Sequence, residues 1–274
     1  MTPSKPKLGQ NFLNDTAAIE RIADSLGDLS ARTAVEIGPG AGAITHALAA
    51  RAHRLIAVEL DPALAAHLRA EFPAENVTIV NQDVLSFDFA AAAARAGQPL
   101  LVFGNLPYYI TSPILLKLAE SHASIDRVAL MVQREVADRV TAQPGSREYG
   151  VLSVTVQLYG PAVNLFTLPP SAFSPPPDVH STVFRWRFAP RFTELGIDQT
   201  TFLPFLRSVF AQKRKTIANN LRAAGHSSRE AGLSSPAIAS ALVRANIPPN
   251  ARAEQLSIES LATLFRALAT PPTA

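Results

Sequence analysis

The chain has 274 residues, of which 47% are hydrophobic and 17% charged, so it has enough apolar material for a buried core and is not a disordered protein. It contains no cysteine, which excludes disulfides, thiolate zinc sites and a cysteine nucleophile. Its length suits one large domain with a smaller one attached.

The first two thirds of the chain alternate apolar runs with helical patterns. Asn14 or Asp15 is placed to cap a helix that carries apolar residues at helical spacing as far as Leu26. Strands are predicted at residues 33–38, 55–60, 77–80, 100–103 and 128–132, with a late pair at 152–158 and 182–188. Strands separated by helices predict an α/β fold, a doubly wound, mostly parallel seven-stranded sheet, and the late pair predicts an antiparallel edge.

The pattern changes after residue 188, because only helical patterns follow. They lie at residues 202–210, 216–223, 236–245 and 258–268. We therefore divide the chain into a sheet domain at 1–188 and a small all-helical domain at 189–274. Neither residues 1–10 nor any later stretch has the apolar run of a signal peptide or a membrane span, so we expect a soluble, cytoplasmic protein.

Charge is distributed unevenly between these two parts. Residues 1–188 hold 15 Lys and Arg against 17 Asp and Glu, whereas residues 189–274 hold 10 against 5. A basic tail is typical of a protein that binds a polyanion, and equally of a solubilising surface. The residues with which it would bind RNA phosphates are Lys213, Arg214, Lys215 and Arg222.

A glycine-rich loop, Gly38-Pro39-Gly40-Ala41-Gly42, joins the first sheet strand to the next helix. Glycines there permit a tight turn and a close approach of the backbone to a ligand. Glu59 ends the second strand, where an acid can bind the ribose hydroxyls of a nucleoside. Both features suit NAD enzymes as well as methyltransferases.

Asp83 follows the third strand and is the third feature at a strand's carboxyl end. A carboxylate there can accept a hydrogen bond from an adenine amine of a bound cofactor. Because such sheets bind ligands at this edge, the series of loop, acid and acid predicts a nucleoside site. A lone aspartate at a strand end is otherwise an ordinary turn residue.

The most specific motif is Asn105-Leu106-Pro107-Tyr108, after the fourth strand. The lone pair of an adenine amine is delocalised into the ring. For the amine nitrogen to attack a methyl sulfonium, that lone pair must be localised on the nitrogen. The Asn105 side-chain oxygen and the Leu106 carbonyl can accept the two amine hydrogens. Pro107 biases Leu106 away from helix, and Tyr108 offers a face on which a flipped base can stack. The motif therefore predicts methylation of adenine.

With these motifs the sequence resembles the ribosomal RNA adenine dimethyltransferases of the KsgA/Dim1 type, over nearly its whole length. The segments that carry the resemblance are residues 8–13 (LGQNFL), 36–40 (EIGPG), 105–110 (NLPYYI), 133–137 (QREVA), 149–150 (YG), 173–181 (FSPPPDVHS), 210–215 (FAQKRK) and 252–257 (RAEQLS). The resemblance implies a class I methyltransferase fold whose helical C-terminal domain binds rRNA.

The resemblance also implies the roles of single residues and the reaction. S-adenosyl-L-methionine would be contacted by Asn11, Leu13, Gly38, Glu59, Asp83 and Asn105. Phe173 would face Tyr108 across the target base, although core packing is the other reading of Phe173. The implied reaction is dimethylation of two adjacent adenines in a hairpin near the 3′ end of 16S rRNA, by a monomer acting on a 30S-like particle during ribosome biogenesis. No metal is expected.

Three alternatives stay open. A relative that acts on large-subunit rRNA, of the erythromycin-resistance type, is the first, although Leu106 is typically isoleucine in that branch. The second is a non-catalytic RNA-binding or transcription factor that has kept the fold. The third, an NAD dehydrogenase, has no use for the Asn105 motif.

Overall fold

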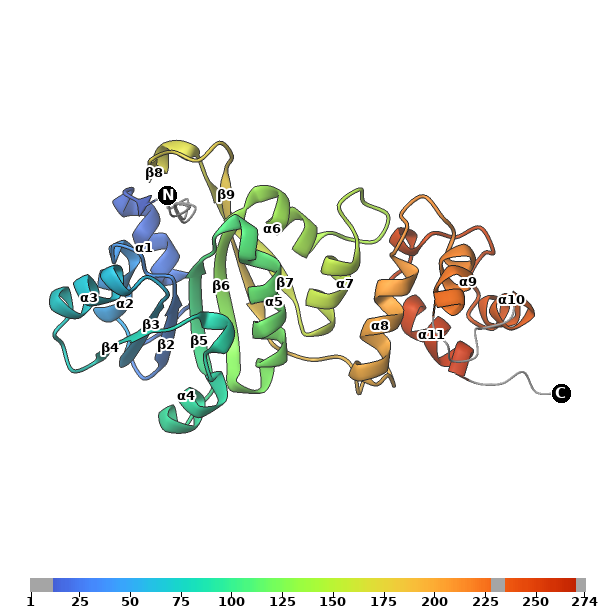
Figure 1. Cartoon of the computed structure of the whole chain (residues 1–274), viewed down its shortest axis with the longest axis horizontal. Coiled ribbons are helices and arrows are strands. Elements are labelled where there is room, and N and C mark those ends of the chain that lie inside the picture. The colour runs from blue at the N-terminus through green and yellow to red at the C-terminus, as the bar shows by residue number, and fades with distance from the viewer. Residues whose placement is uncertain (1–11, 228–234, 270–274) are drawn as a thin grey trace, which may run out of the picture. The chain divides into compact units, whose positions relative to one another are not determined.

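The computed structural model describes residues 12–227 and 235–269, which form two compact units (Figure 1). The first unit comprises residues up to Ala137 together with Ala162–Phe188, and the second comprises Asp138–Pro161 together with the chain from Ala189. From the sequence, a single boundary is predicted after residue 188. The chain does change units there, but residues 138–161 also group with the second unit.

The first unit is built on a seven-stranded sheet, as the sequence predicts. The strand order is β4-β3-β2-β5-β6-β9-β7, and the five strands from β4 to β6 are parallel. β9 is antiparallel to both of its neighbours, which confirms the antiparallel edge. The bounds are β2 Thr33–Ile37, β3 Arg54–Glu59, β4 Val77–Asn81, β5 Leu100–Asn105, β6 Ile125–Gln133, β7 Ala162–Leu168 and β9 Ser181–Arg187.

Helices cover both faces of this sheet (Figure 1). On one face, alternate strand residues such as Ala34, Leu101 and Phe103 pack with α1 and α2, while α4 and α5 cover the other face. Aspartates cap several of these helices, and Asp15 accepts from the Ala18 N–H at the start of α1, as predicted. The bounds are α1 Thr16–Asp24, α2 Ala43–Ala49, α3 Pro62–Glu71, α4 Phe89–Ala96, α5 Thr111–Glu120 and α6 Arg134–Thr141.

One predicted strand is wrong: residues 152–158 belong to a helix, α7 (Val151–Leu158). A short run that alternates apolar and polar residues does not by itself separate strand from helix. Here Ser153 favours the helix, because its hydroxyl accepts from the Gly150 N–H and donates to the Arg139 carbonyl. The strand that pairs with β9 is instead β7, a few residues further on.

The second unit is helical where the sequence predicts helices. Its later helices are α8 Gln199–Val209, α9 Ile217–Ser227, α10 Ser235–Arg244 and α11 Ile258–Ala269. Phe202, Phe205 and Phe265 pack their rings together between α8 and α11, with centroids 5.2–5.5 Å apart. In the described ranges, no helix has the length and apolar character needed to cross a membrane.

Candidate active site

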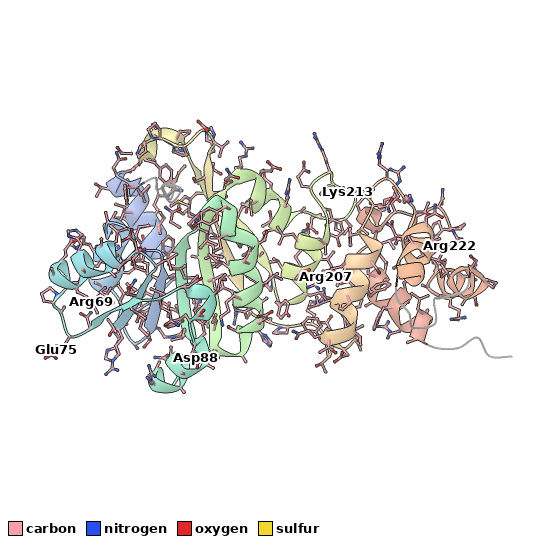
Figure 2. The ribbon with its side chains drawn as sticks, in the orientation of Figure 1. Arg69, Glu75, Asp88, Arg207, Lys213 and Arg222 are labelled. Atoms are coloured by element: carbon pink, nitrogen blue, oxygen red, sulfur yellow. The ribbon has the colours of Figure 1, made fainter. Side chains whose placement is uncertain are left out.

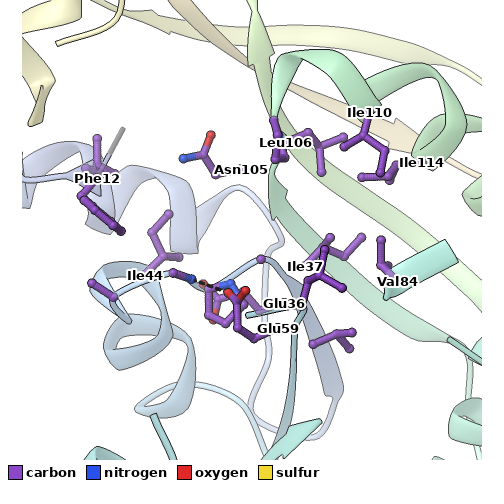
Figure 3. Close-up of a pocket in the computed structure, with 18 of the residues that line it drawn as sticks. Phe12, Glu36, Ile37, Ile44, Glu59, Val84, Asn105, Leu106, Ile110 and Ile114 are labelled. Carbon is purple, nitrogen blue, oxygen red and sulfur yellow. Dashed lines mark hydrogen bonds between the residues drawn. The ribbon is translucent and has the colours of Figure 1, made fainter. Parts of the chain in front are cut away.

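A cavity of about 170 Å³ opens at the carboxyl ends of β2, β3 and β5, in the first unit (Figure 3). Its walls bring together most of the predicted site residues from segments far apart in the sequence. The predicted residues that line it are Leu13, Gly38, Glu59, Asp83, Asn105, Leu106, Pro107 and Phe173.

The glycine loop forms one wall of the cavity, and its backbone needs glycine at three places. Gly38, Gly40 and Gly42 have φ angles of +64°, +59° and +85°, which L side chains rarely adopt. A Cβ on Gly40 would also lie 3.2 Å from the Phe12 ring. The loop therefore presents bare backbone to the cavity, as a site for a nucleoside cofactor requires.

Glu59 is buried at the end of β3 and holds this loop in place. One carboxylate oxygen accepts from the Gly40 N–H at 3.1 Å, and the other accepts from the Asp61 N–H at 2.9 Å. The residue thus has two tasks: it lines the cavity, and it ties the glycine loop to the end of β3.

Asp83 and Asn105 extend from two other strand ends. One oxygen of Asp83 accepts from the Leu85 N–H at 2.9 Å, which caps the short 3₁₀ turn η1 (Val84–Ser86) and fixes the carboxylate at the cavity wall. The Asn105 side chain projects into the open space of the cavity (Figure 3). It makes no hydrogen bond within the described ranges. Its amide is thus left for a ligand.

Leu106 and Pro107 form a firmly held turn after β5. The Leu106 N–H donates to the Met131 carbonyl at 2.9 Å, and the Leu106 side chain is buried. It folds back over Gly104, where an added Cβ would lie 2.8 Å from the leucine Cδ2. The backbone carbonyl of Leu106 therefore has a fixed position beside Asn105. The side chain of Tyr108 lies outside what the structure describes.

Leu13 and Phe173 meet across a two-stranded sheet, β1 (Phe12–Leu13) with β8 (Phe173–Ser174). Both side chains are buried in the core cluster as well as lining the cavity. The pairing joins the N-terminal motif to the late loop, which local pattern alone could not reveal. Asn11 lies outside the described residues, and so does the relation of Phe173 to the Tyr108 side chain.

Glu36 also lines the cavity, although its position in the sequence did not predict a role for it. It lies near the carboxyl end of the buried strand β2, is 2% exposed and is drawn beside Glu59 in Figure 3. Burial, together with the neighbouring Glu59 carboxylate, raises its pKa to about 7, although the Thr45 hydroxyl acts in the opposite direction. One of its oxygens has no hydrogen-bond partner in the described chain. An acid within an otherwise apolar strand was the signal available in the sequence.

The four basic residues predicted to bind RNA all lie in the second unit (Figure 2 labels Lys213 and Arg222). Lys213, Arg214 and Lys215 are exposed in the connection between α8 and α9. Arg222 is half-buried, and its guanidinium donates to Ser235 and Asn219 at 3.0 and 2.7 Å. Its availability to a phosphate is therefore lower than that of the other three.

A model of the family described as ribosomal RNA adenine dimethylase matches residues 1–270. The chain belongs to this family. Among curated members, the ribosomal RNA small subunit methyltransferase A of Acidobacterium capsulatum is 58% identical over 96% of this chain and 91% of its own length. The enzyme of the same name from Koribacter versatilis is 46% identical over 96% and 94%.

Solved structures agree with this membership of the dimethylase family. The crystal structure of the 23S rRNA methyltransferase ErmE covers 95% of this chain and 100% of its own, with 25% identity and a TM-score of 0.70. A dimethyladenosine transferase from Plasmodium falciparum covers 93% and 96%, with 20% identity and a TM-score of 0.77, and shows the likeness of fold. The class I methyltransferase fold is thereby confirmed.

Proposed function

We propose that this enzyme uses S-adenosyl-L-methionine to dimethylate the N6 amines of two adjacent adenines in a hairpin near the 3′ end of 16S rRNA. The observation that carries the proposal is the shared cavity: Asn105 and the Leu106 turn line the same space as the glycine loop, Glu59 and Asp83. A nucleoside cofactor site and an adenine-amine site are thus contiguous. Family membership and the names of the relatives support the substrate.

The residues present fit such a cofactor. The glycine loop offers bare backbone, Glu59 ends the strand at the ribose position and Asp83 presents a fixed carboxylate. When bound, S-adenosyl-L-methionine supplies a methyl group on a cationic sulfur. The Glu59 carboxylate lies beside this space, which suits a cationic ligand.

To catalyse methyl transfer, the protein must localise the lone pair of the adenine amine on its nitrogen. The Asn105 side-chain oxygen and the Leu106 carbonyl accept the amine hydrogens, and the bond from Leu106 to Met131 holds the second acceptor still. The product ammonium is acidic once formed, so no strong general base is required. After the first transfer the monomethylated amine has one hydrogen left, so during the second transfer only one of the two acceptors can engage it.

The other activities considered have less support. The curated relatives at 58% and 46% identity carry the small-subunit name, which favours small-subunit over large-subunit rRNA. The intact Asn105 turn argues against a factor that has lost catalysis. We further propose that the enzyme acts in the cytoplasm, as a monomer, on an assembled 30S-like particle, with the helical part at 189–274 binding rRNA and Tyr108 and Phe173 enclosing the base.

The deciding experiment is mass spectrometry of ribosomal RNA from cells that lack this protein. Loss of dimethyladenosine from the small-subunit RNA, restored by the purified protein with S-adenosyl-L-methionine, is the expected result. Retention of all dimethyladenosine in the small subunit, or its loss from the large subunit instead, would contradict the proposal.

Cofactor affinity should depend on Glu59 and Asp83. Removing one partner of a buried polar interaction costs about 1–3 kcal/mol, so Glu59→Ala and Asp83→Ala should each weaken cofactor binding by roughly 5- to 150-fold in calorimetric titration. Glu59→Gln keeps one acceptor for the glycine loop and should lose less than Glu59→Ala. The exposed acid Glu75, outside this cavity, supplies the control Glu75→Gln. Unchanged affinity in both alanine variants would remove these residues from the site.

RNA binding should depend on the basic residues between α8 and α9. The slope of log affinity against log salt falls by roughly 0.7–0.9 for each RNA phosphate that the protein no longer neutralises, so the double reversal Arg214→Glu with Lys215→Glu should reduce it by about 1.4–1.8. Reversal of the exposed Arg207 on α8 is the matched control (Figure 2). Cofactor affinity should stay the same in all of them. An unaltered salt slope would identify these residues as a solvated surface.

A further inference from the structure

Tyr109 stands out at the rim of the active-site cavity. It follows the Asn105–Tyr108 turn directly, lines the cavity and is 66% exposed. Of the large hydrophobic side chains that are exposed in the described ranges, Tyr109 is the aromatic one. The others are Leu60, Leu116, Val151, Val163, Val179 and Val243. A large aromatic ring that is exposed to solvent beside a candidate active site indicates a binding role.

The backbone that carries this ring is firmly held. Tyr109 is the middle residue of the 3₁₀ turn η2 (Tyr108–Ile110). The Pro107 carbonyl accepts both the Ile110 N–H, at 3.2 Å, and the Thr111 hydroxyl, at 3.1 Å. Thr111 is buried and begins α5, so the turn is anchored on both sides. The ring therefore stays at the rim, with only its own side-chain rotations free.

The Tyr109 ring has no polar or aromatic contact with the described residues. In the part of the chain that the structure describes, the Tyr109 phenol has no hydrogen bond and the ring has no aromatic neighbour. No contact among the described residues thus accounts for an aromatic residue at this position. A planar ring that is fixed, exposed and unoccupied is the kind of platform on which proteins stack single-stranded bases.

We propose that Tyr109 stacks on the nucleotide next to the adenine that occupies the cavity. This inference rests on the function proposed above. When the target adenine is flipped into the cavity it leaves its stack, and the adjacent base loses a neighbour. The Tyr109 ring, at the rim of the cavity, replaces that neighbour. Because the two target adenines are consecutive, the second adenine would wait on Tyr109 while the first is methylated.

The alternative occupant of this ring is the cofactor, since Tyr109 lines the same cavity as Glu59 and Asp83. The two possibilities differ in what a truncation changes. A ring that stacks on RNA affects the KM for the RNA substrate and leaves cofactor affinity alone. A ring that covers the cofactor affects cofactor affinity instead.

The first test compares Tyr109→Ala, Tyr109→Phe and the control Leu116→Ala, an exposed residue of α5 outside the cavity. Stacking of one base is worth about 1–3 kcal/mol, so Tyr109→Ala should raise the KM for undermethylated small subunits by roughly 5- to 150-fold. Tyr109→Phe keeps the ring and should stay within about twofold of the wild type, by the same argument. Calorimetric cofactor affinity should be unchanged in all three. An unchanged KM in Tyr109→Ala, or a loss of cofactor affinity, would overturn the proposal.

A second test does not depend on catalysis. The chain has a single tryptophan, Trp186, which is fully buried, so Tyr109→Trp adds an exposed fluorophore with a separable signal. We expect a single-stranded RNA hairpin loop with two adjacent adenines to quench it, and a fully paired duplex of equal length to quench it far less. Equal quenching by both would overturn stacking. Wild-type protein that leaves small-subunit adenines unmethylated would instead overturn the proposed function, independently of the fluorescence result.

Discussion

Asn105→Ala is expected to lower the rate of methyl transfer about 10²–10³-fold at saturating cofactor and RNA, as typically follows loss of one preorganised group that acts on developing charge. The Asn105 side chain projects into the cavity and has no hydrogen bond within the described ranges (Figure 3), so no group in those ranges competes with the amine for it. Single-turnover assays on undermethylated small subunits, read by mass spectrometry of digested nucleosides, measure this rate.

The matched control is Asn164→Ala, on the exposed edge strand β7 and outside the cavity, which should keep the wild-type rate. Asn105→Ala should bind RNA with near wild-type affinity, because the stacking groups are retained. A near wild-type rate at saturating cofactor would exclude localisation of the amine lone pair by Asn105. Monomethyladenosine as the sole end product of the wild type would contradict dimethylation.

The sequence was sufficient to predict that most of the candidate site residues meet at one cavity, because they lie at strand ends. In a parallel sheet the carboxyl ends of the strands share one edge, so the glycine loop, Glu59, Asp83 and Asn105 had to converge once the strands were assigned. The periodic apolar stripes likewise predicted the helices α8 to α11 of the second unit. These features depend on local patterns of a few residues, which a single sequence contains.

The features that the sequence did not predict depend on interactions between distant segments of the chain. The helix at Val151–Leu158 is stabilised by Ser153 and by Gln157, whose amide donates to the Val140 and Ala142 carbonyls at 3.1 and 2.8 Å. The meeting of Leu13 with Phe173 needs a two-residue strand pair too short to be recognised in advance. Only the resemblance to a known family had brought those two residues into the site.

Glu36 differs from the predicted and the unpredicted features above. Its position in a strand could be predicted from the sequence, but the raised pKa of its carboxyl could not. A strand assignment places it inside the sheet, but the state of its carboxyl depends on how completely the surroundings exclude water and on the carboxylate of Glu59. In the folded chain it is 2% exposed, and one oxygen has no partner in the described residues. A buried, poorly solvated acid prefers its proton, so the fold makes the stability of the protein depend on pH near neutrality.

The free energy of unfolding of Glu36→Gln, minus that of the wild type, should therefore increase as pH rises from acid to alkaline values. The pKa of Glu36 is raised from 4.5 to about 7, so between these values the folded state binds more protons than the unfolded state. The contribution of Glu36 is then fully present below about pH 4.5 and is lost as pH rises through 7, by roughly 3 kcal/mol. Glutamine resembles the protonated acid in shape and cannot ionise, so the variant does not undergo this loss of stability.

Urea unfolding of both proteins at pH 5 and pH 8 measures the difference in stability, with Glu75→Gln as the exposed control. A stability difference between Glu36→Gln and wild type that stays constant across this range would show that Glu36 is ionised throughout.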